Sequence, residues 1–179
     1  MQTIDCIRQR RSIRKFTKEP VSHETLEKIV EAASYSPSWK NTQVVRYIAI
    51  EDPSLRERIA KECTTGFVYN AGTLEAAPVI IAVTVIKGRC GYEKDGSFTT
   101  NRKDTWQMFD AGIASQTFCL AACELGLGTV IMGIFDESLS ELLNIPEDRE
   151  LVNLICLGYP AEEPSVPKRK TVEDLLTYK

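Results

Sequence analysis

Residues 79–86 have the sequence VIIAVTVI, in which every side chain except Ala82 is β-branched. Such side chains favour extended backbone, and an apolar run without polar alternation is typical of a strand covered on both faces. The stretch therefore predicts the central strand of a sheet, and the neighbouring elements of the fold should be arranged around it.

Towards the N-terminus the pattern indicates one more strand and two helices. Residues 44–50 (VVRYIAI) are β-branched and aromatic, which predicts a strand, and residues 52–54 (DPS) then open a helix. Apolar side chains recur at helical spacing through residues 26–33, behind Ser22, which is a good N-cap residue. We expect this second helix to stop before Pro37.

Two stretches beside the central strand, 64–77 and 87–104, are rich in Gly, Thr, Asn, Asp and Lys. This composition is typical of surface loops, which often carry specificity. We therefore expect both stretches to be exposed loops.

The longest predicted helix runs from Thr105 to Leu125, and the sequence GLG at 126–128 predicts a left-handed cap at its end. We expect one side of the helix to face the core and a patch of small residues to allow close contact with another helix, in the same chain or between subunits. The expected inner residues are Trp106, Phe109, Ile113, Leu120 and Ala121, and the small residues are Ala111, Gly112, Ala114 and Ser115.

The C-terminal third completes the pattern. We expect strands at 129–133 and 151–157, joined by a helix that Asp136 caps and that ends near Pro146. At the two ends of the chain, Thr3 is a candidate cap for a short first helix and Thr171 for a short last one. The tail that precedes this last helix, residues 158–170, contains three prolines.

Composition limits the class of protein. A chain of 179 residues that is 43% hydrophobic fits one domain, residues 1–179, with a sizeable core. The net charge of −3 argues against nucleic-acid binding, which needs a broad basic face. No stretch has the pattern of a secretory signal, and Asp110, Gln116 and Glu124 interrupt the one long apolar helix. We expect a cytoplasmic protein with no nucleic-acid or membrane partner.

The cysteines and the single histidine do not form a metal or catalytic motif. The six cysteines include no CxxC pair, and Cys119 and Cys123 lie four apart in an apolar helical stretch, so we expect reduced core residues. His23 falls in the first turn of a helix, which is usually exposed. We therefore expect no metal site and no histidine-based triad.

A basic cluster at residues 10–16 (RRSIRKF) is the first candidate binding site, with four cations and a hydroxyl in an acidic protein. Arginine matches phosphate oxygens with paired hydrogen bonds, and the hydroxyl of Ser12 can complete the cradle. From these residues alone, a phosphate site and a solvated basic turn are equally acceptable. A second basic trio at 168–170 (KRK) would join this site only if the tail returns to it.

The second candidate is the loop at residues 36–43 (SPSWKNTQ), between a predicted helix and a predicted strand. Pro37 fixes the turn, and Ser38, Asn41 and Gln43 then offer donors and acceptors together, which would suit the edge of an amphoteric ring. The alternative is that Ser38 and Asn41 satisfy the backbone of the turn itself.

Four motifs, taken in order, closely resemble the FMN-dependent nitroreductase family. They are RRSIRKF at 10–16, SPS at 36–38 with Asn41 and Gln43, DAGIASQ at 110–116 running into LGLGT at 125–129, and GYP at 158–160. The resemblance covers nearly the whole chain. It implies an α+β fold, a mixed sheet flanked by helices, and an intertwined homodimer with two FMN sites at the subunit interface. The long helix would then lie at the dimer core.

The resemblance also implies roles for the residues of the basic cluster. Arg10 and Ser12 would hold the FMN phosphate together with Lys168 or Arg169 from the tail. Arg14 would lie nearer the ribityl chain and the N1/O2 side of the flavin, where a cation favours the anionic reduced ring. Arg11 completes the expected cofactor-binding set, with solvated charge as the alternative.

For the flavin ring, the resemblance implies the 36–43 loop and one backbone segment. Pro37, Ser38, Asn41 and Gln43 would lie against the isoalloxazine of the partner subunit. Gly133, or its neighbour Ile134, aligns with the segment that passes close to flavin N5, where a glycine admits close approach. Many relatives continue after the glutamine with Pro-Trp, whereas this chain has Val44-Val45, so a different pocket wall is expected and analogies to the relatives' substrates are weaker.

The implied activity is that of an NAD(P)H-dependent oxidoreductase. NAD(P)H would reduce FMN, and the flavin would then reduce a small electron-poor acceptor such as a nitroaromatic, a quinone or an activated alkene. We expect no catalytic side chain, because the cofactor carries the chemistry. Two alternatives are a flavin protein of the same fold that breaks down flavin or removes halogens, and a flavin-binding redox sensor or store without turnover.

Overall fold

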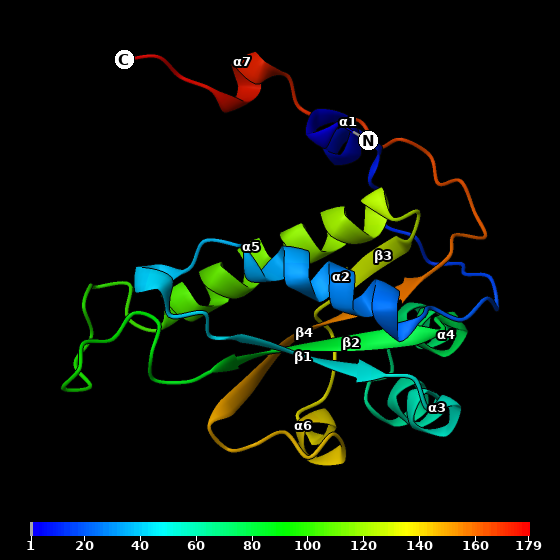
Figure 1. Ribbon diagram of the computed structural model, residues 1–179, viewed down its shortest axis with the longest axis horizontal. Helices are drawn as coiled ribbons and strands as arrows, with labels where there is room; N and C mark the ends of the chain where they lie inside the picture. Colours follow the sequence, from blue (N-terminus) through cyan, green and yellow to red (C-terminus); the bar gives the residue numbers. More distant parts are fainter. Residues whose placement is uncertain (1) are drawn as a thin grey trace.

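The computed structural model describes residues 2–179, which fold around a four-stranded sheet (Figure 1). All the pairings between the named strands are antiparallel, and the parallel part of the expected mixed sheet is a bridge between Ser12 and Thr129. The strands, in the spatial order β1-β2-β4-β3, are β1 (Val45–Ile50), β2 (Val79–Ile86), β4 (Arg149–Gly158) and β3 (Gly128–Met132).

β2 is the central strand, as its sequence predicts. It lies between β1 and β4, so that Ile80 is opposite Ile50 on one side and Cys156 on the other. Every residue from Val79 to Val85 is buried. The uninterrupted apolar run therefore reflects a strand with both faces covered, where polar alternation would leave side chains without partners.

Helices cover the two faces and confirm the α+β class. On one face Ile29 and Phe118 of two helices pack with Ile81, and on the other face Leu74 and Leu139 pack with Ile80. The first face is covered by α2 (His23–Ser34) and α5 (Thr105–Glu124), and the second by α3 (Pro53–Glu62), α4 (Val68–Ala76) and α6 (Ser138–Leu142) (Figure 1). Three short helices complete the fold: α1 (Thr3–Gln9), the 3-10 turn η1 (Trp39–Asn41) and α7 (Val172–Leu175).

Three of the predicted helix caps are confirmed and two are wrong. Ser22, Asp52 and Thr171 each accept a hydrogen bond from the backbone N–H three residues further on. Thr3 lies inside α1, whose N-cap makes no side-chain bond. Asp136 lies two residues before α6, and its carboxylate instead accepts a hydrogen bond at 2.9 Å from the backbone N–H of the 64–67 turn.

The predicted left-handed cap after the long helix is confirmed. Gly126 has φ of +79°, and the N–H of Leu127 donates to the carbonyl of Ala122 at 2.8 Å. The N–H of Gly126 also donates to Cys123 at 3.0 Å, which completes the Schellman pattern of hydrogen bonds. The cap turns the chain directly from α5 into β3.

One of the two predicted loops is wrong. Residues 64–77 contain α4, in which Thr73 and Leu74 are buried. Gly72 hid this helix from the sequence pattern, and the helix depends on packing against α3 and the sheet for its stability. Residues 87–104 do form a loop, with a bridge between Tyr92 and Phe98 as its regular feature.

The predicted inner face of the long helix is wrong in part. The buried side of α5 carries Ala111, Ala114, Phe118 and Ala122, whereas Phe109 is 58% exposed. The other four predicted residues are partly buried, and two of them, Trp106 and Ala121, pack against the core. The helix is apolar on nearly every side, so its periodicity does not distinguish the side that faces the sheet from the side that faces outward.

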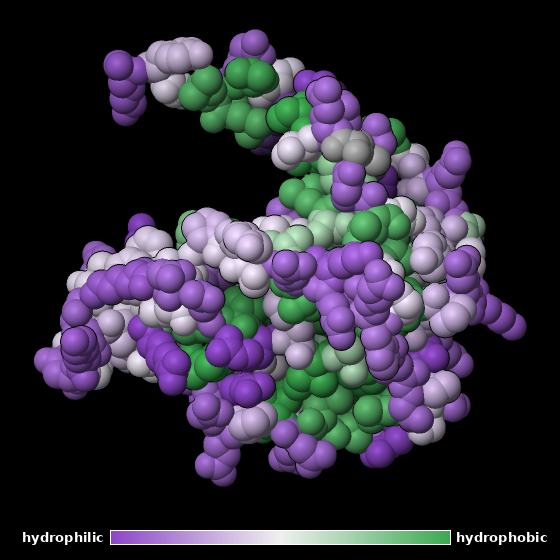
Figure 2. Space-filling view, in the orientation of Figure 1, coloured by the Kyte–Doolittle hydropathy of each residue, from purple (hydrophilic) through white to green (hydrophobic). Residues whose placement is uncertain are grey.

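The two ends of the chain leave apolar surface uncovered. Ile4 and Ile7 on α1 are exposed, and the C-terminal arm with α7 extends away from the body of the fold beyond α1 (Figure 1). Green atoms on this arm in Figure 2 mark its apolar side, which includes Leu175 and Leu176. In residues 2–179 no helix combines the length and the apolar character needed to cross a bilayer.

The six cysteines are free thiols, and the prediction of core residues is confirmed for all except Cys123, which is half-buried. His23 is exposed, and its Nε2 lies 2.9 Å from a carboxylate oxygen of Glu51. Within residues 2–179 no cluster of histidine, cysteine, aspartate or glutamate side chains could hold a metal ion.

Candidate functional site

The basic cluster lies as an extended segment beside the first residues of β3. The N–H of Ile13 donates to the carbonyl of Thr129 at 3.0 Å, and Phe16 forms a bridge with Pro160 just after β4. Ile13 is buried, whereas Ser12 is half-buried and Arg14 is exposed. The segment is therefore anchored through its backbone and its apolar side chain, which leaves the polar side chains accessible.

Two glycines allow this close contact between the segment and the sheet. A Cβ at Gly128 would lie 2.6 Å from Cγ1 of Ile13, and a Cβ at Gly158 would lie 2.5 Å from Cγ of Pro78 and 3.0 Å from Phe16. Any side chain at these positions would push the segment away from the sheet. The glycines of the LGLGT and GYP motifs thus set the position of the basic cluster.

The first part of the tail folds back onto the basic cluster. The N–H of Ala161 donates to the carbonyl of Lys15 at 2.9 Å, and the carboxylate of Glu162 accepts the backbone N–H groups of Arg14 and Lys15 at 2.7 and 3.2 Å. A groove of about 840 Å³ lies between the two segments. Its lining includes Arg10, Arg11, Gly128, Thr129, Glu162 and Val166.

This arrangement brings together the two remote segments, as the sequence prediction required, but not all of their cations. Arg10 and Arg11 line the groove, and Val166 is the last tail residue that reaches it. Lys168 and Arg169 follow as exposed residues of the C-terminal arm.

The cations of the site have no acidic side-chain partner. Among the ion pairs within residues 2–179, none involves Arg10, Arg14, Lys168 or Arg169. Nη1 of Arg11 donates to the carbonyls of Arg8 and Arg10 at 2.5 and 2.9 Å, which fixes its guanidinium beside the groove. Because Glu162 already occupies the backbone amides of Arg14 and Lys15, an anion in this groove would be bound by side chains.

A third part of the candidate site is the segment that follows β3. Gly133 and Ile134 are exposed, and a Cβ added to Gly133 would meet no heavy atom within 4 Å. The fold itself therefore does not require glycine here, which leaves room for close approach by a ligand. The side-chain amide of Asn70 donates to the carbonyl of Ile134 at 3.5 Å. Sequence reasoning missed Asn70 because α4 was read as a loop.

The 36–43 loop forms the second half of the site and is strained. Lys40, Asn41 and Gln43 have positive φ values of 45°, 56° and 47°, a backbone conformation that residues other than glycine rarely adopt. Oγ of Ser38 accepts the N–H of Gln43 at 3.0 Å, so the alternative in which Ser38 satisfies the turn is observed. The side chains of Asn41 and Gln43 are exposed and bond to each other at 3.2 Å.

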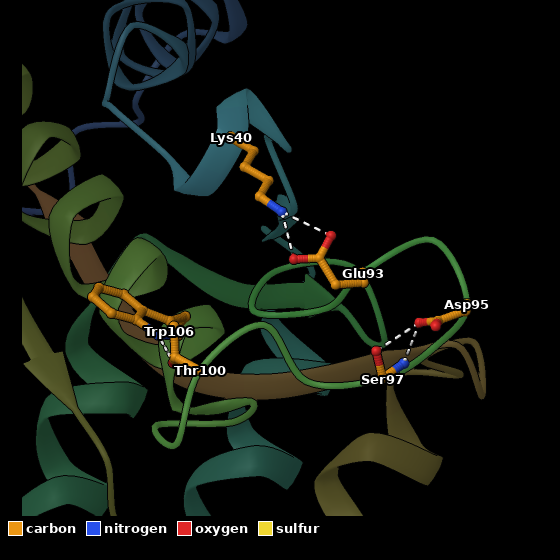
Figure 3. A network of polar contacts seen from close by, with 6 residues as sticks. All are labelled: Lys40, Glu93, Asp95, Ser97, Thr100 and Trp106. Atoms are coloured by element: carbon orange, nitrogen blue, oxygen red, sulfur yellow. Dashed lines mark hydrogen bonds and ion pairs between the residues drawn. The ribbon is translucent and has the colours of Figure 1, made fainter.

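The long loop at 87–104 lies against this strained loop. Nζ of Lys40 lies 2.9 Å from a carboxylate oxygen of Glu93 (Figure 3), and this lysine holds the pKa of Glu93 below its ordinary value. Nε1 of Trp106 donates to Oγ1 of Thr100 at 2.9 Å, which fixes the end of the loop to the start of α5 (Figure 3). The 87–104 loop is therefore held between the 36–43 loop and the start of α5.

The two halves of the site lie towards opposite ends of α5. The 36–43 loop is bound at Asp110, near the start of the helix, whereas the basic groove includes Cys123 near its end. At 1.5 Å per residue, these positions are about 20 Å apart along the helix axis. The residues that would hold the phosphate and the ring loop of the same chain are thus well separated.

Comparison with known proteins agrees with this arrangement of motifs. A model of the nitroreductase family matches residues 7–159. The chain belongs to this family. The matched range includes the basic cluster, the 36–43 loop and Gly133, and it ends before Lys168 and Arg169.

Individual members of the nitroreductase family resemble the whole chain. The chain is 30% identical to an NADPH-flavin oxidoreductase of Vibrio harveyi over 93% of this chain and 69% of the relative. It is 32% identical to an FMN reductase [NAD(P)H] of Bacillus subtilis over 90% of this chain and 67% of that relative. The solved structure of the NADPH:FMN oxidoreductase from Vibrio harveyi complexed with NAD+ superposes with a TM-score of 0.82 at 27% identity, covering 98% of this chain and 76% of that one. The nitroreductase fold is therefore shared along nearly the whole chain.

Proposed function

We propose that this protein is an FMN-dependent oxidoreductase that takes electrons from NAD(P)H and passes them to a small electron-poor acceptor. The observation that carries the proposal is the groove between residues 10–16 and the tail. Its arginines have no acidic side-chain partner among residues 2–179, and glycines fix its shape. Relatives that act on flavin and NAD(P)H support the same reading.

The phosphate of FMN fits the basic groove. Arg10 would bind its oxygens from the lining of the groove, with Arg11 adding charge from the side. Ser12 is half-buried and lies outside the lining, so its hydroxyl would reach the phosphate from the edge of the groove. Lys168 and Arg169 would complete the site from the tail, since the arm beyond Val166 is exposed and free to close over a bound dianion. The closed position of the arm would be stabilised by its contacts with the bound ligand.

The flavin ring would use the remaining residues. Arg14 is exposed beside the groove, where its guanidinium would face the N1/O2 side of the ring. Gly133 has open space above it, which suits close backbone approach to N5. Pro37, Ser38, Asn41 and Gln43 would come from the partner subunit, because within one chain they lie about 20 Å from the basic groove.

The chemistry that bound FMN would supply is uptake of a hydride from NAD(P)H and subsequent reduction of the acceptor. The residues of the chain would bind, orient and shield this group. Arg14 would stabilise negative charge that develops on the pyrimidine side of the ring, which raises its tendency to be reduced. No side chain of the described site is placed to act as an acid or a base, so we assign no catalytic residue.

A homodimer is part of the proposal. Phe109 on the outer side of α5 and Ile4 and Ile7 on α1 are exposed apolar residues, and the C-terminal arm carries more of them. A second copy would cover these surfaces and bring its own 36–43 loop to the cofactor. Interfaces between permanent subunits are apolar in this way.

The test of this function is NAD(P)H oxidation without oxygen. We expect the protein with FMN to oxidise NADH or NADPH anaerobically when a nitroaromatic or a quinone is supplied, with the acceptor reduced in equal amount. Turnover that requires oxygen would favour flavin breakdown, and anaerobic loss of halide from a halogenated phenol alone would favour dehalogenation. Bound FMN with negligible turnover for every acceptor would favour a sensor or store, and each of these results would contradict the proposal.

A further inference from the structure

Asp110 is a buried carboxylate that none of the roles above uses. It lies in the first third of α5 and is 3% exposed. Among the described residues it has no lysine or arginine partner. A buried carboxylate without a cation is unfavourable unless its oxygens accept hydrogen bonds, so the groups that donate to Asp110 define its role.

Two donors from two different loops reach the same oxygen. Oδ2 of Asp110 accepts the backbone N–H of Trp39 at 2.9 Å and the thiol of Cys90 at 3.1 Å. Burial raises the pKa of Cys90 to about 12, so this thiol keeps its proton and remains a donor at neutral pH. Asp110 therefore connects α5 both to the 36–43 loop and to the start of the 87–104 loop.

The 36–43 loop depends on such connections because none of its side chains is fully buried. Three of its residues have positive φ, as described above. A cavity of about 380 Å³ lies behind it, and Pro37, Ser38 and Gln43 line this cavity together with Asp110. With open space on its inner side, the strained conformation must be maintained by hydrogen bonds at a few points.

Of these points, the bond to Asp110 is the most protected. The pair of Lys40 and Glu93 is exposed to solvent, where ion pairs contribute little. Oγ of Ser36 donates to Oγ1 of Thr117 at 2.8 Å, but this bond precedes the strained residues. The bond from Trp39 lies next to them, and the ring of Trp39 packs on Trp106 with centroids 4.7 Å apart.

We propose that Asp110 is a positioning residue, which holds the 36–43 loop in the conformation that presents Ser38, Asn41 and Gln43 to the flavin ring of the partner subunit. This inference rests on the proposed function for the identity of the ring. It assigns Asp110 no contact with the cofactor. Its effect would pass through the backbone of Trp39 to the three residues that follow.

The test compares Asp110→Leu, which removes the acceptor, with Asp110→Asn, which keeps a side-chain oxygen for the N–H of Trp39. In Asp110→Leu we expect amide hydrogen exchange at residues 39–43 to accelerate about tenfold, while the amides of β2 and β4 keep their protection. The Kd for FMN should rise about tenfold in the same variant. Asp110→Asn should restore both quantities to within about threefold of the wild-type values.

Asn153→Ala is the matched control, because Asn153 is buried and bonds to Ser115 of the same helix at 3.1 Å without touching the loop. It should lower the global stability and leave exchange in the loop unchanged. If Asp110→Leu does not fold, Asp110→Ser supplies the same comparison, since its hydroxyl is too short to reach Trp39.

Two results would overturn the inference. One is wild-type exchange at residues 39–43 in Asp110→Leu, and the other is equal loosening of the loop in Asn153→Ala. Failure of the proposed function has a different signature, because the wild-type protein would then bind no FMN while the exchange comparison would still decide whether Asp110 holds the loop.

Discussion

Arg10 illustrates how a residue acquires a role from its surroundings. By sequence alone its cluster was equally acceptable as a phosphate site or as a solvated turn. In the structure, Arg10 lines a groove. Within residues 2–179 no acidic side chain forms an ion pair with it. An unpaired guanidinium at a concave surface is a better ligand-binding candidate than one in a surface ion pair.

Arg10→Ala should weaken FMN binding, because it removes a charge-assisted bond worth about 1.5–3 kcal/mol. We therefore expect the Kd for FMN to rise between about 10-fold and 150-fold. Titration of the apoprotein with FMN, followed by flavin fluorescence, measures this change. Lys15→Ala is the matched control, since Lys15 is exposed in the same cluster and lies outside the groove. Equal losses in the two variants would indicate a general charge effect and not a bound phosphate.

Gly128→Ala should affect both the fold and the site. The added methyl group would overlap Ile13, so the basic segment must shift away from β3. We expect a loss of roughly 1–3 kcal/mol in the free energy of unfolding and weaker FMN binding, as for other overpacked positions. Urea denaturation and flavin titration measure the two effects. Gly66→Ala, at a glycine with positive φ but open space, should lower stability and leave FMN affinity unchanged.

Several residue roles were visible in the sequence, and the others depended on tertiary contacts. The caps at Ser22 and Asp52 follow local rules, so a local pattern predicts them. Asp136 has the same residue type, but its carboxylate bonds to a distant turn, which no local pattern reveals. Asn70 and the bond between Trp39 and Asp110 are likewise long-range contacts between elements.

At the scale of elements, the length of α5 is predicted well from the sequence, but the side of the helix that is buried is not. Its length and its glycine cap follow from sequence. The sequence does not show which side of α5 is buried, because the helix carries apolar residues both on the side that packs on the sheet and on the outer side. One side packs on the sheet through Phe118, and the outer side leaves Phe109 exposed in a single chain. An apolar outer side on a helix of a folded chain indicates a partner surface.

Phe109→Glu should disrupt the proposed dimer, because it places a charge on the exposed apolar surface of α5. We expect sedimentation velocity to show a monomer, or at least a tenfold weaker dimer, at micromolar protein concentration. Val68→Glu is the control, since Val68 is 79% exposed on α4 outside the proposed interface. A monomeric wild-type protein, or a fully dimeric Phe109→Glu variant, would exclude this interface.

At the scale of the whole molecule, the fold follows from the strand whose sequence is VIIAVTVI. A strand buried on both faces requires helices above and below it, and the amphipathic pattern of α2 and the caps of α3 supply two of them. The order β1-β2-β4-β3 cannot be read from any single segment, since antiparallel neighbours are chosen by packing and by connection geometry. The family resemblance implied a mixed sheet flanked by helices, but not the order of its strands.

The buried thiols make the stability of the whole protein sensitive to alkaline pH. Burial raises the pKa of Cys90 and of Cys156 to about 12, above the ordinary value of 9.0. The folded state therefore holds these protons more tightly than the unfolded state. Their contribution to stability is complete below about pH 9 and is lost as pH rises from 9 towards 12.

Urea denaturation at pH values from 8 to 11 measures this loss. Each such thiol should lower the free energy of unfolding by up to about 1.4 kcal/mol per pH unit once the unfolded thiol ionises. Cys156→Ala should show a shallower decline than the wild-type protein, although it starts from a lower stability because of the cavity it leaves. Parallel declines in the two proteins would mean that Cys156 does not contribute to the pH dependence.

The central claim is that the basic groove, the exposed Gly133 segment and the partner's loop together bind FMN. The absorption spectrum of the purified protein, reconstituted with FMN, dialysed and then treated with NADH or NADPH without oxygen, tests this most directly. The account predicts the two visible bands of bound flavin, which bleach on addition of the nucleotide and return when a quinone or nitroaromatic is added. A colourless protein that does not retain FMN after reconstitution would contradict it.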